Sequence, residues 1–285
     1  MYQRLKYRRQ FLISKIRIES LVKWTCLDLG DLYLYAHPDM EVHSVENQNQ
    51  RIVLLGNMFD AEEPEKGNVD LVEDLLARTG GLNAFLTGAR QYAGNYALLY
   101  QSDQNMVIMQ EALALREIYY CTRENKIICG SQPNLLLSFA DPAIQETSNP
   151  DLLDFYRNHM KDSSWIGDET FYEGVKHLLP NHYLDIRCRK VHRYWPNKPL
   201  RQLDLDQAVS QICAYLQGIM KSMAYRHSLM LAVTSGTDSR TLLAASKDLR
   251  EKIYYYINTH NNLGHSHPDI YVPKAMFDKI GIPFH

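Results

Sequence analysis

The sequence has no apolar run long enough to cross a membrane, no cysteine pair spaced to hold zinc, and no excess of charge of one sign. Its longest apolar runs, such as 52–55 and 229–233, fall far short of the roughly 18–20 residues that a bilayer requires. The five cysteines are an odd number without Cys-x-x-Cys spacing, so we interpret them as free thiols in a reducing compartment. The formal charge of −2 gives no indication of binding to nucleic acid or to a membrane. These absences predict a soluble, cytoplasmic protein.

The composition is that of a folded globular chain. The 285 residues allow one large domain or two ordinary ones, and 45% apolar and 22% charged residues are close to the globular average. In the first half, short runs rich in tyrosine and β-branched residues alternate with turn signals, which predicts strands near 31–36, 51–55, 96–100, 106–109, 117–120 and 126–129. The close spacing of the last four predicts an antiparallel meander.

Two helices are predicted in the same half. Apolar residues at 69, 71, 72, 75 and 76 line one face of a helix that Asn68 would cap. The basic first 17 residues lack the serine richness and cleavage site of a targeting segment, so we interpret them as a solvated N-terminal helix. The result is an α+β layered domain that ends near residue 138. A proline-containing connecting region follows, over 139–200, with a helix after Pro150 and a strand from His182.

After Leu205 the pattern changes to alternating helices and strands. It predicts helices over 206–224, 239–249 and 272–279, strands over 229–233 and 252–257, and the beginning of a third strand over 281–285. The continuous apolar run at 229–233 is typical of a strand buried on both faces of a parallel sheet. Because a doubly wound domain normally has about five parallel strands, this segment is the start of one.

The sharpest chemical signal is the turn from the strand at 229–233 into the following helix, Thr234-Ser235-Gly236-Thr237-Asp238-Ser239. Small residues let backbone N–H groups approach an anion, and a helix N-terminus adds partial positive charge. Asp238 could face a phosphate only with a cation such as Mg²⁺ between them. The alternative is an ordinary capped helix start with nothing bound. A P-loop is excluded because no lysine follows the glycine.

This turn resembles the pyrophosphate loop of the PP-loop ATP pyrophosphatases, Ser-Gly-Gly-x-Asp-Ser, with Gly236, Asp238 and Ser239 matching and Ser235 replacing a glycine. Together with 167–184 and Arg193-Tyr-Trp-Pro196, it makes residues 30–285 similar to the asparagine synthetase family. That family joins an N-terminal nucleophile glutaminase to an ATP-dependent amide-forming domain. The resemblance implies a glutaminase-like α+β domain with its linker over 1–195, then the start of a doubly wound α/β PP-loop (adenine nucleotide α-hydrolase-like) domain over 196–285.

The glutaminase chemistry of the family is missing from the matching positions. Tyr2 stands where the family exposes its cysteine nucleophile, and the first cysteine is Cys26. Leu55-Gly56 matches the family's Asn-Gly pair, and Ala93-Gly94 matches its Asp-Gly pair, so an oxyanion donor and a substrate acceptor are both lost. We therefore expect a glutaminase-like fold without glutamine hydrolysis.

The resemblance implies an asparagine synthetase-like ligase that activates a carboxylate, by family default aspartate, as an acyl-adenylate. Its cofactors would be ATP and Mg²⁺. Ammonia or an amine, as in members resembling β-lactam synthetases, would then form the amide. The implied nucleotide site is the set Val233, Thr234, Ser235, Gly236, Thr237, Asp238, Ser239 and Ile257. Asp238 would bind the metal, Val233 and Ile257 would border the adenine, and an acidic residue such as Asp269 often precedes the next helix.

Three further points stay open at the level of sequence. The alternative to a ligase is a non-catalytic or truncated module that binds nucleotide or a partner. We expect the 285-residue chain alone not to turn over ATP at an enzymatic rate, because only two complete strands follow residue 228. A homodimer or a separate C-terminal polypeptide could supply the rest of the sheet.

Overall fold

The computed structural model describes residues 6–123, 126–139, 150–160, 165–259, 264 and 266–285. They divide into two compact units, 1–58 with 68–200 and 59–67 with 201–285. The second unit combines the C-terminal residues from 201 onward with the loop 59–67 from the first half of the chain. No helix among the described residues is long and apolar enough to span a membrane.

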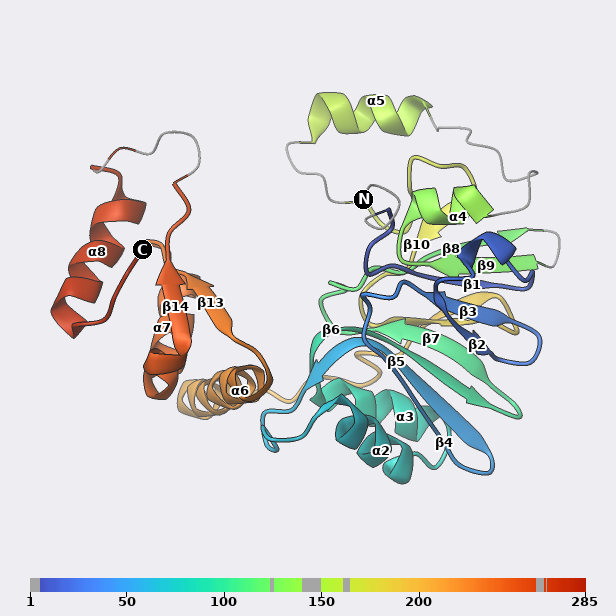
Figure 1. Cartoon of the computed structure of the whole chain (residues 1–285), viewed down its shortest axis with the longest axis horizontal. Coiled ribbons are helices and arrows are strands. Elements are labelled where there is room, and N and C mark those ends of the chain that lie inside the picture. The colour runs from blue at the N-terminus through green and yellow to red at the C-terminus, as the bar shows by residue number, and fades with distance from the viewer. Residues whose placement is uncertain (1–5, 124–125, 140–149, 161–164, 260–263, 265) are drawn as a thin grey trace. The chain divides into compact units, whose positions relative to one another are not determined.

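The first unit contains two six-stranded sheets (Figure 1). The first has the order β10-β8-β9-β1-β3-β2 and is antiparallel throughout. Its strands are β1 (Phe11–Ser14), β2 (Thr25–Asp28), β3 (Tyr33–Ala36), β8 (Tyr119–Arg123), β9 (Lys126–Gly130) and β10 (Val175–His177).

The second sheet has the order β12-β11-β7-β6-β5-β4. Its strands are β4 (Val42–Glu46), β5 (Gln50–Phe59), β6 (Ala93–Ser102), β7 (Met106–Gln110), β11 (His182–Asp185) and β12 (Lys190–Arg193). A short 3-10 helix, Glu19–Leu21, lies between β1 and β2, and a second, Ala89–Gln91, precedes β6.

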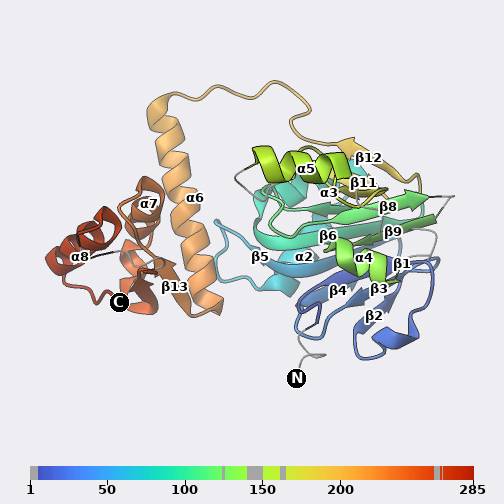
Figure 2. The ribbon, with the colours of Figure 1, turned by 90° about the horizontal axis from the view of Figure 1, so that it is seen from above.

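Three apolar clusters show that this unit has four layers. The central cluster, with Phe11, Val53 and Leu99, is drawn from both sheets. A second cluster packs α2 (Asn68–Arg78) and α3 (Leu82–Gly88) on the outer face of the β4–β12 sheet. A third packs α4 (Pro133–Phe139) on the outer face of the other sheet. Figure 1 shows this helix-sheet-sheet-helix order, and Figure 2 shows the same unit from above, with α4 in front of the strands. The expected α+β layered domain is therefore confirmed.

The predicted meander is wrong. β6 and β7 form a hairpin in one sheet, whereas β8 and β9 form a hairpin in the other. The chain changes sheet at the turn after β7, where the Glu111 carboxylate accepts the N–H groups of Leu113 (2.8 Å) and Arg116 (2.9 Å). Alternating apolar residues predict a strand but not the sheet that it joins, because both inner faces meet the same core.

Two other expectations for the first half are corrected. Within the predicted N-terminal helix, Phe11–Ser14 is instead the fully buried strand β1, paired with β3 and β9. Its three-residue apolar run, Phe11 to Ile13, outweighs the flanking charges because it fills the space between two strands. The connecting region 139–200 also extends both sheets, through β10 and through the β11–β12 hairpin. Its predicted helix is present as α5 (Pro150–His159), and its predicted strand is β11.

The α2 helix is confirmed, and Leu71, Val72, Leu75 and Leu76 are buried, although Val69 is 44% exposed. The side chain of Asn68 connects the start of α2 to β5. Its oxygen accepts the Met58 N–H (3.0 Å), and its amide donates to the Gly56 carbonyl (3.3 Å).

The second unit contains α6 (Leu205–Arg226), β13 (Leu229–Ala232), α7 (Thr237–Ala245), β14 (Ile253–Tyr256) and α8 (Pro268–Ile280), with a 3-10 turn over Lys247–Lys252. β13 and β14 pair in parallel, in the predicted order. His285 extends this pairing, since its N–H donates to Tyr255 (3.1 Å) and its carbonyl accepts from Ile257 (2.9 Å). The sequence therefore predicted the order of these elements correctly.

β13 is not buried on both faces, contrary to the expectation. Leu229, Leu231 and Val233 pack against Tyr255 and Phe277 in one cluster, but Met230 on the opposite face is 66% exposed. Among the described residues, helices cover only one face of this pair of strands. In this structure the continuous apolar run at 229–233 is therefore a strand with only one face covered, the face of Leu229, Leu231 and Val233.

Candidate functional site

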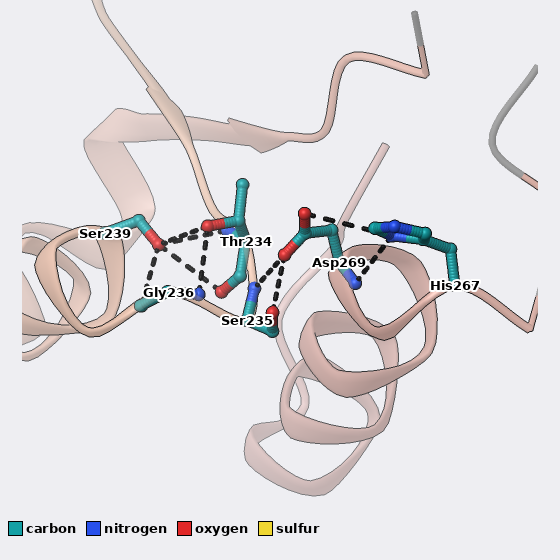
Figure 3. A network of polar contacts seen from close by, with 6 residues as sticks. All are labelled: Thr234, Ser235, Gly236, Ser239, His267 and Asp269. Atoms are coloured by element: carbon teal, nitrogen blue, oxygen red, sulfur yellow. Dashed lines mark hydrogen bonds and ion pairs between the residues drawn. The ribbon is translucent and has the colours of Figure 1, made fainter. Parts of the chain in front are cut away.

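The turn between β13 and α7 folds into a loop closed by its own hydroxyl groups (Figure 3). The Thr234 N–H donates to Ser239 Oγ (3.0 Å), and the Gly236 N–H donates to Thr234 Oγ1 (3.1 Å). The Ser239 hydroxyl also lies 3.1 Å from Thr234 Oγ1 and 3.2 Å from the Gly236 carbonyl. These contacts hold the loop in one shape and bring together four of the predicted residues, Thr234, Ser235, Gly236 and Ser239.

The Ser235 side of the loop holds a carboxylate. Asp269 Oδ1 accepts the Ser235 hydroxyl at 2.5 Å and the Ser235 N–H at 3.0 Å (Figure 3). These two hydrogen bonds, with His267 nearby, lower the pKa of Asp269 below its usual value. Asp269 lies in the first turn of α8, where His267 is the N-cap and accepts the Asp269 N–H (3.2 Å). The loop therefore already binds one oxyanion, which a neighbouring helix of the same chain supplies.

The other predicted residues lie around this loop without joining its network. Thr237 and Asp238 are exposed in the first turn of α7, and no described residue forms a hydrogen bond or ion pair with the Asp238 carboxylate. Val233 is fully buried and donates its N–H to Tyr256 (2.9 Å), whereas Ile257 is half-buried. Val233 and Ile257 continue two adjacent strands, as the sequence predicted for residues bordering one crevice.

Asp238 offers a single carboxylate to a cation. The described residues contain no group of three or more His, Cys, Asp or Glu side chains placed to hold a metal. One carboxylate is nevertheless compatible with Mg²⁺, which commonly takes one or two protein carboxylates and completes its shell with water and phosphate oxygens. The sequence also contains three histidines, at 260, 265 and 267, that could be interpreted as a metal cluster, but a polar loop explains them as well. Positions 260 and 265 lie outside the described residues, and His267 is the N-cap of α8.

Arg240, in the first turns of α7, lies beside the loop, and the sequence interpretation did not consider it. Its Nε donates to the Gly236 carbonyl at 3.2 Å, which places a guanidinium beside the loop. A basic residue one helical turn after the loop glycine was the available signal. Because an arginine fork can donate several hydrogen bonds to phosphate oxygens, this position is chemically relevant.

At the positions that match the family's glutaminase motifs, the backbone has a conformation and a close contact that require glycine, but the adjacent side chains have no catalytic group. Gly56 has φ +114°, and a Cβ there would lie 2.2 Å from the Asn95 carbonyl oxygen. Gly94 has φ +143°, and its Cβ would lie 2.1 Å from the Asn57 oxygen. Each glycine thus contacts the strand that carries the other, at a distance that no side chain allows.

Beside these glycines, Leu55 is fully buried in the central core and Ala93 carries only a methyl group. Neither can donate or accept a hydrogen bond through its side chain. Cys26 is exposed in β2, an edge strand, and Tyr2 lies outside the described residues. The described positions contain no group for the oxyanion or substrate roles that the family assigns there.

Comparisons with known proteins give distant similarity. No family model matches the chain. The curated protein Amidase chry2 of Gibberella zeae is 22% identical over 125 residues, which are 41% of this chain and 17% of that protein. The chain therefore spans less than a fifth of the length of this relative.

Two solved structures also resemble the model. One is glutamine phosphoribosylpyrophosphate amidotransferase from B. subtilis with ADP and GMP, at a TM-score of 0.39 and 10% identity. The other is an allosteric regulatory enzyme of purine biosynthesis, at a TM-score of 0.39 and 11% identity. Both alignments cover 96% of this chain and 66% of the other. Similarity at this level does not by itself establish a common fold.

Proposed function

We propose that the chain is an asparagine synthetase-like, ATP-dependent amide-forming ligase with an inactive glutaminase-like half. The observation that carries the proposal is the loop at 234–239, in which a hydroxyl and a backbone N–H of Ser235 already hold a carboxylate oxygen. A pyrophosphate oxygen presents the same kind of acceptor to these donors. The loop also opens a helix of nine residues, whose N-terminus favours negative charge.

Each loop residue has a role in this proposal. Ser235, with the hydroxyls of Thr234 and Ser239, binds the β- and γ-phosphates, and Arg240 contributes charge beside them. Asp238 holds Mg²⁺, which neutralises the leaving pyrophosphate. Val233 and Ile257 border the adenine. The four-layer first unit agrees with the glutaminase-like fold that the resemblance implies.

The proposed reaction is the one that the resemblance to the asparagine synthetase family implies. An oxygen of the substrate carboxylate attacks the α-phosphorus of ATP, and the bond from that phosphorus to the bridging oxygen breaks. Pyrophosphate leaves, and the products of this step are an acyl-adenylate and Mg-pyrophosphate. Ammonia or an amine then attacks the acyl carbon and releases AMP, which forms the amide. The name of the curated match, an amidase, agrees with chemistry at an amide bond.

Binding of ATP by the whole chain, measured calorimetrically with and without Mg²⁺, tests the loop assignment. Ser235→Ala removes one donor and is expected to weaken ATP binding under both conditions. Asp238→Asn keeps the shape but removes the charge, so it is expected to weaken binding only when Mg²⁺ is present. Thr241→Ala is the matched control, because its hydroxyl donates to the Thr237 carbonyl on α7. Unchanged Mg-ATP binding by Asp238→Asn would show that Asp238 is only part of a helix start.

The second candidate is a module that binds nucleotide without catalysis. The Asp269 carboxylate in the loop favours a module that binds nucleotide weakly or serves only to bind a partner, because this negative charge competes with phosphate for Ser235. Pyrophosphate release that depends on an added carboxylate, and is lost in Asp238→Asn, would identify a ligase. Because only two complete strands follow residue 228, the chain alone is expected to bind Mg-ATP without such release. Absence of Mg-ATP binding would support a module that only binds a partner.

A further inference from the structure

A cavity of about 180 Å³ lies in the first unit, apart from the loop at 234–239. Its walls come from the 3-10 turn Ala89–Gln91, the start of β6, the residues after β7, and the segment that follows β12. A cavity of about 150 Å³ is enough to bind benzene in an engineered protein, so this one has room for a ring or a short branched chain.

Four of the ten residues that line the cavity are aromatic. Tyr92, Tyr96, Tyr194 and Trp195 line the cavity. The Tyr96 hydroxyl is fixed, because it lies 3.1 Å from the Ala89 carbonyl and 3.2 Å from the Tyr92 carbonyl. Burial raises the pKa of both Tyr96 and Tyr194, so these phenols stay neutral at physiological pH. Among the described residues, the Tyr194 hydroxyl has no hydrogen-bond partner, which leaves it available to a ligand.

A buried carboxylate also lines the cavity. Glu111 is 4% exposed, and the backbone N–H groups of Leu113 and Arg116 hold its two oxygens in place. No basic side chain among the described residues forms an ion pair with it. The Arg116 guanidinium donates to the Arg9 carbonyl (3.0 Å), and its charge acts on Glu111 only from beyond ion-pair distance. Because a buried charge is poorly screened, the interior of the cavity favours a positive group.

The aromatic wall already contacts one cationic side chain, Arg90. Its guanidinium lies 5.7 Å from the centre of the Trp195 ring, within the range of a cation–π contact. Arg90 is exposed, so water and salt weaken its repulsion of a second cation. The cavity thus combines neutral aromatic faces, one buried carboxylate and one solvent-screened arginine.

We propose that this cavity binds a small organic cation, a primary ammonium on a group about the size of one aromatic ring. The ammonium would lie toward Glu111 and the Tyr194 hydroxyl, and the apolar group would contact the faces of Tyr92 and Trp195. An anion of the same size would meet the buried charge of Glu111. A neutral analogue would gain the apolar contacts only.

Three probes of one size test the proposal on the whole chain, namely benzylamine, benzyl alcohol and benzoate, with affinities from calorimetry or NMR titration at pH 7. Benzylamine is expected to bind at least about tenfold more tightly than either of the others, because a buried charge-assisted contact contributes more than 1.4 kcal/mol, the equivalent of a tenfold change. Equal binding of the three probes, tighter binding of benzoate, or binding of none overturns it.

Two variants change the charges with opposite expected signs. Glu111→Gln should remove the preference for benzylamine over benzyl alcohol. Arg90→Gln removes the competing cation and should strengthen benzylamine binding about two- to fivefold, since exposed charges at this range contribute less than about 1 kcal/mol. Weaker benzylamine binding in Arg90→Gln overturns the proposal. If Glu111→Gln does not fold, as judged by circular dichroism, Tyr194→Phe replaces it. This variant removes the hydroxyl beside the ammonium and should reduce the preference for benzylamine over benzyl alcohol, and retention of the full preference there overturns the proposal as well.

Discussion

Alanine at Gly94 should destabilise the first unit far more than alanine at Gly81, although both glycines have nearly the same backbone. Their φ angles are +143° and +136°, where an L-residue is strained by about 1–3 kcal/mol. Nothing lies within 4 Å of a Cβ at Gly81, whereas a Cβ at Gly94 would lie 2.1 Å from the Asn57 carbonyl oxygen. Relieving that overlap requires β5 and β6 to separate, and overpacking of this kind costs about 1–3 kcal/mol.

The expected losses in the free energy of unfolding are therefore about 1–3 kcal/mol for Gly81→Ala and about 2–6 kcal/mol for Gly94→Ala. A typical domain has only about 5–15 kcal/mol, so Gly94→Ala should shift the urea midpoint strongly. Urea unfolding followed by circular dichroism measures both midpoints, and the slope should stay constant if the unfolded states match. Equal losses in the two variants would show that strain alone governs Gly94 and that the close approach of the strands is not tight.

Three further results are expected. Asp269 should titrate below its usual pKa, so the stability that its hydrogen bonds to Ser235 contribute is complete above about pH 4 and is lost as the pH falls through the lowered pKa. In Ser235→Ala the pKa of Asp269, measured by carboxyl NMR, should rise. An unchanged pKa would contradict the link between the two residues. In Gly218→Ala the new Cβ would lie 2.1 Å from the Ala61 carbonyl oxygen, so the loop 59–67 would have to move away from it. Trypsin should therefore cleave this loop faster than in the wild-type chain. Unchanged cleavage would refute the contact between Gly218 and Ala61. The chain should release no glutamate from glutamine above a blank; release that Cys26→Ala abolishes would instead identify Cys26 as a nucleophile.

Local elements of the fold could be predicted from the sequence because their causes are local. The helices α2, α6 and α8 follow apolar periodicity, and the parallel pair β13 and β14 follows two short runs rich in apolar and tyrosine residues. The sheet that a strand joins has no such local cause. The hairpins β6–β7 and β8–β9 have the same alternation, yet they lie in different sheets, and the turn fixed by Glu111 between them separates the two.

The candidate loop was predictable for a related reason. Small residues with hydroxyl groups at the end of a strand limit the backbone to a few shapes, and Thr234, Ser235, Gly236 and Ser239 do lie together. The link from Ser235 to Asp269 spans 34 residues and depends on the placement of α8. Spacing alone cannot give such a contact. The same holds for the cavity beside Glu111, whose wall combines residues near 90, 111 and 194.

At Gly56 and Gly94 the backbone requires glycine, whereas the residues directly before them, Leu55 and Ala93, are not subject to that requirement. Gly56 and Gly94 contact opposing strands at distances that admit no Cβ, so the fold itself requires glycine at both positions. No close backbone contact restricts the side chains of Leu55 and Ala93. Leu55 is fully buried in the central core, where a polar side chain without a hydrogen-bond partner would lower stability. Glycine at these two positions is therefore a requirement of the fold, whatever chemistry the neighbouring side chains carry. Asparagine in place of Leu55 would bury a polar amide in the core and should cost stability.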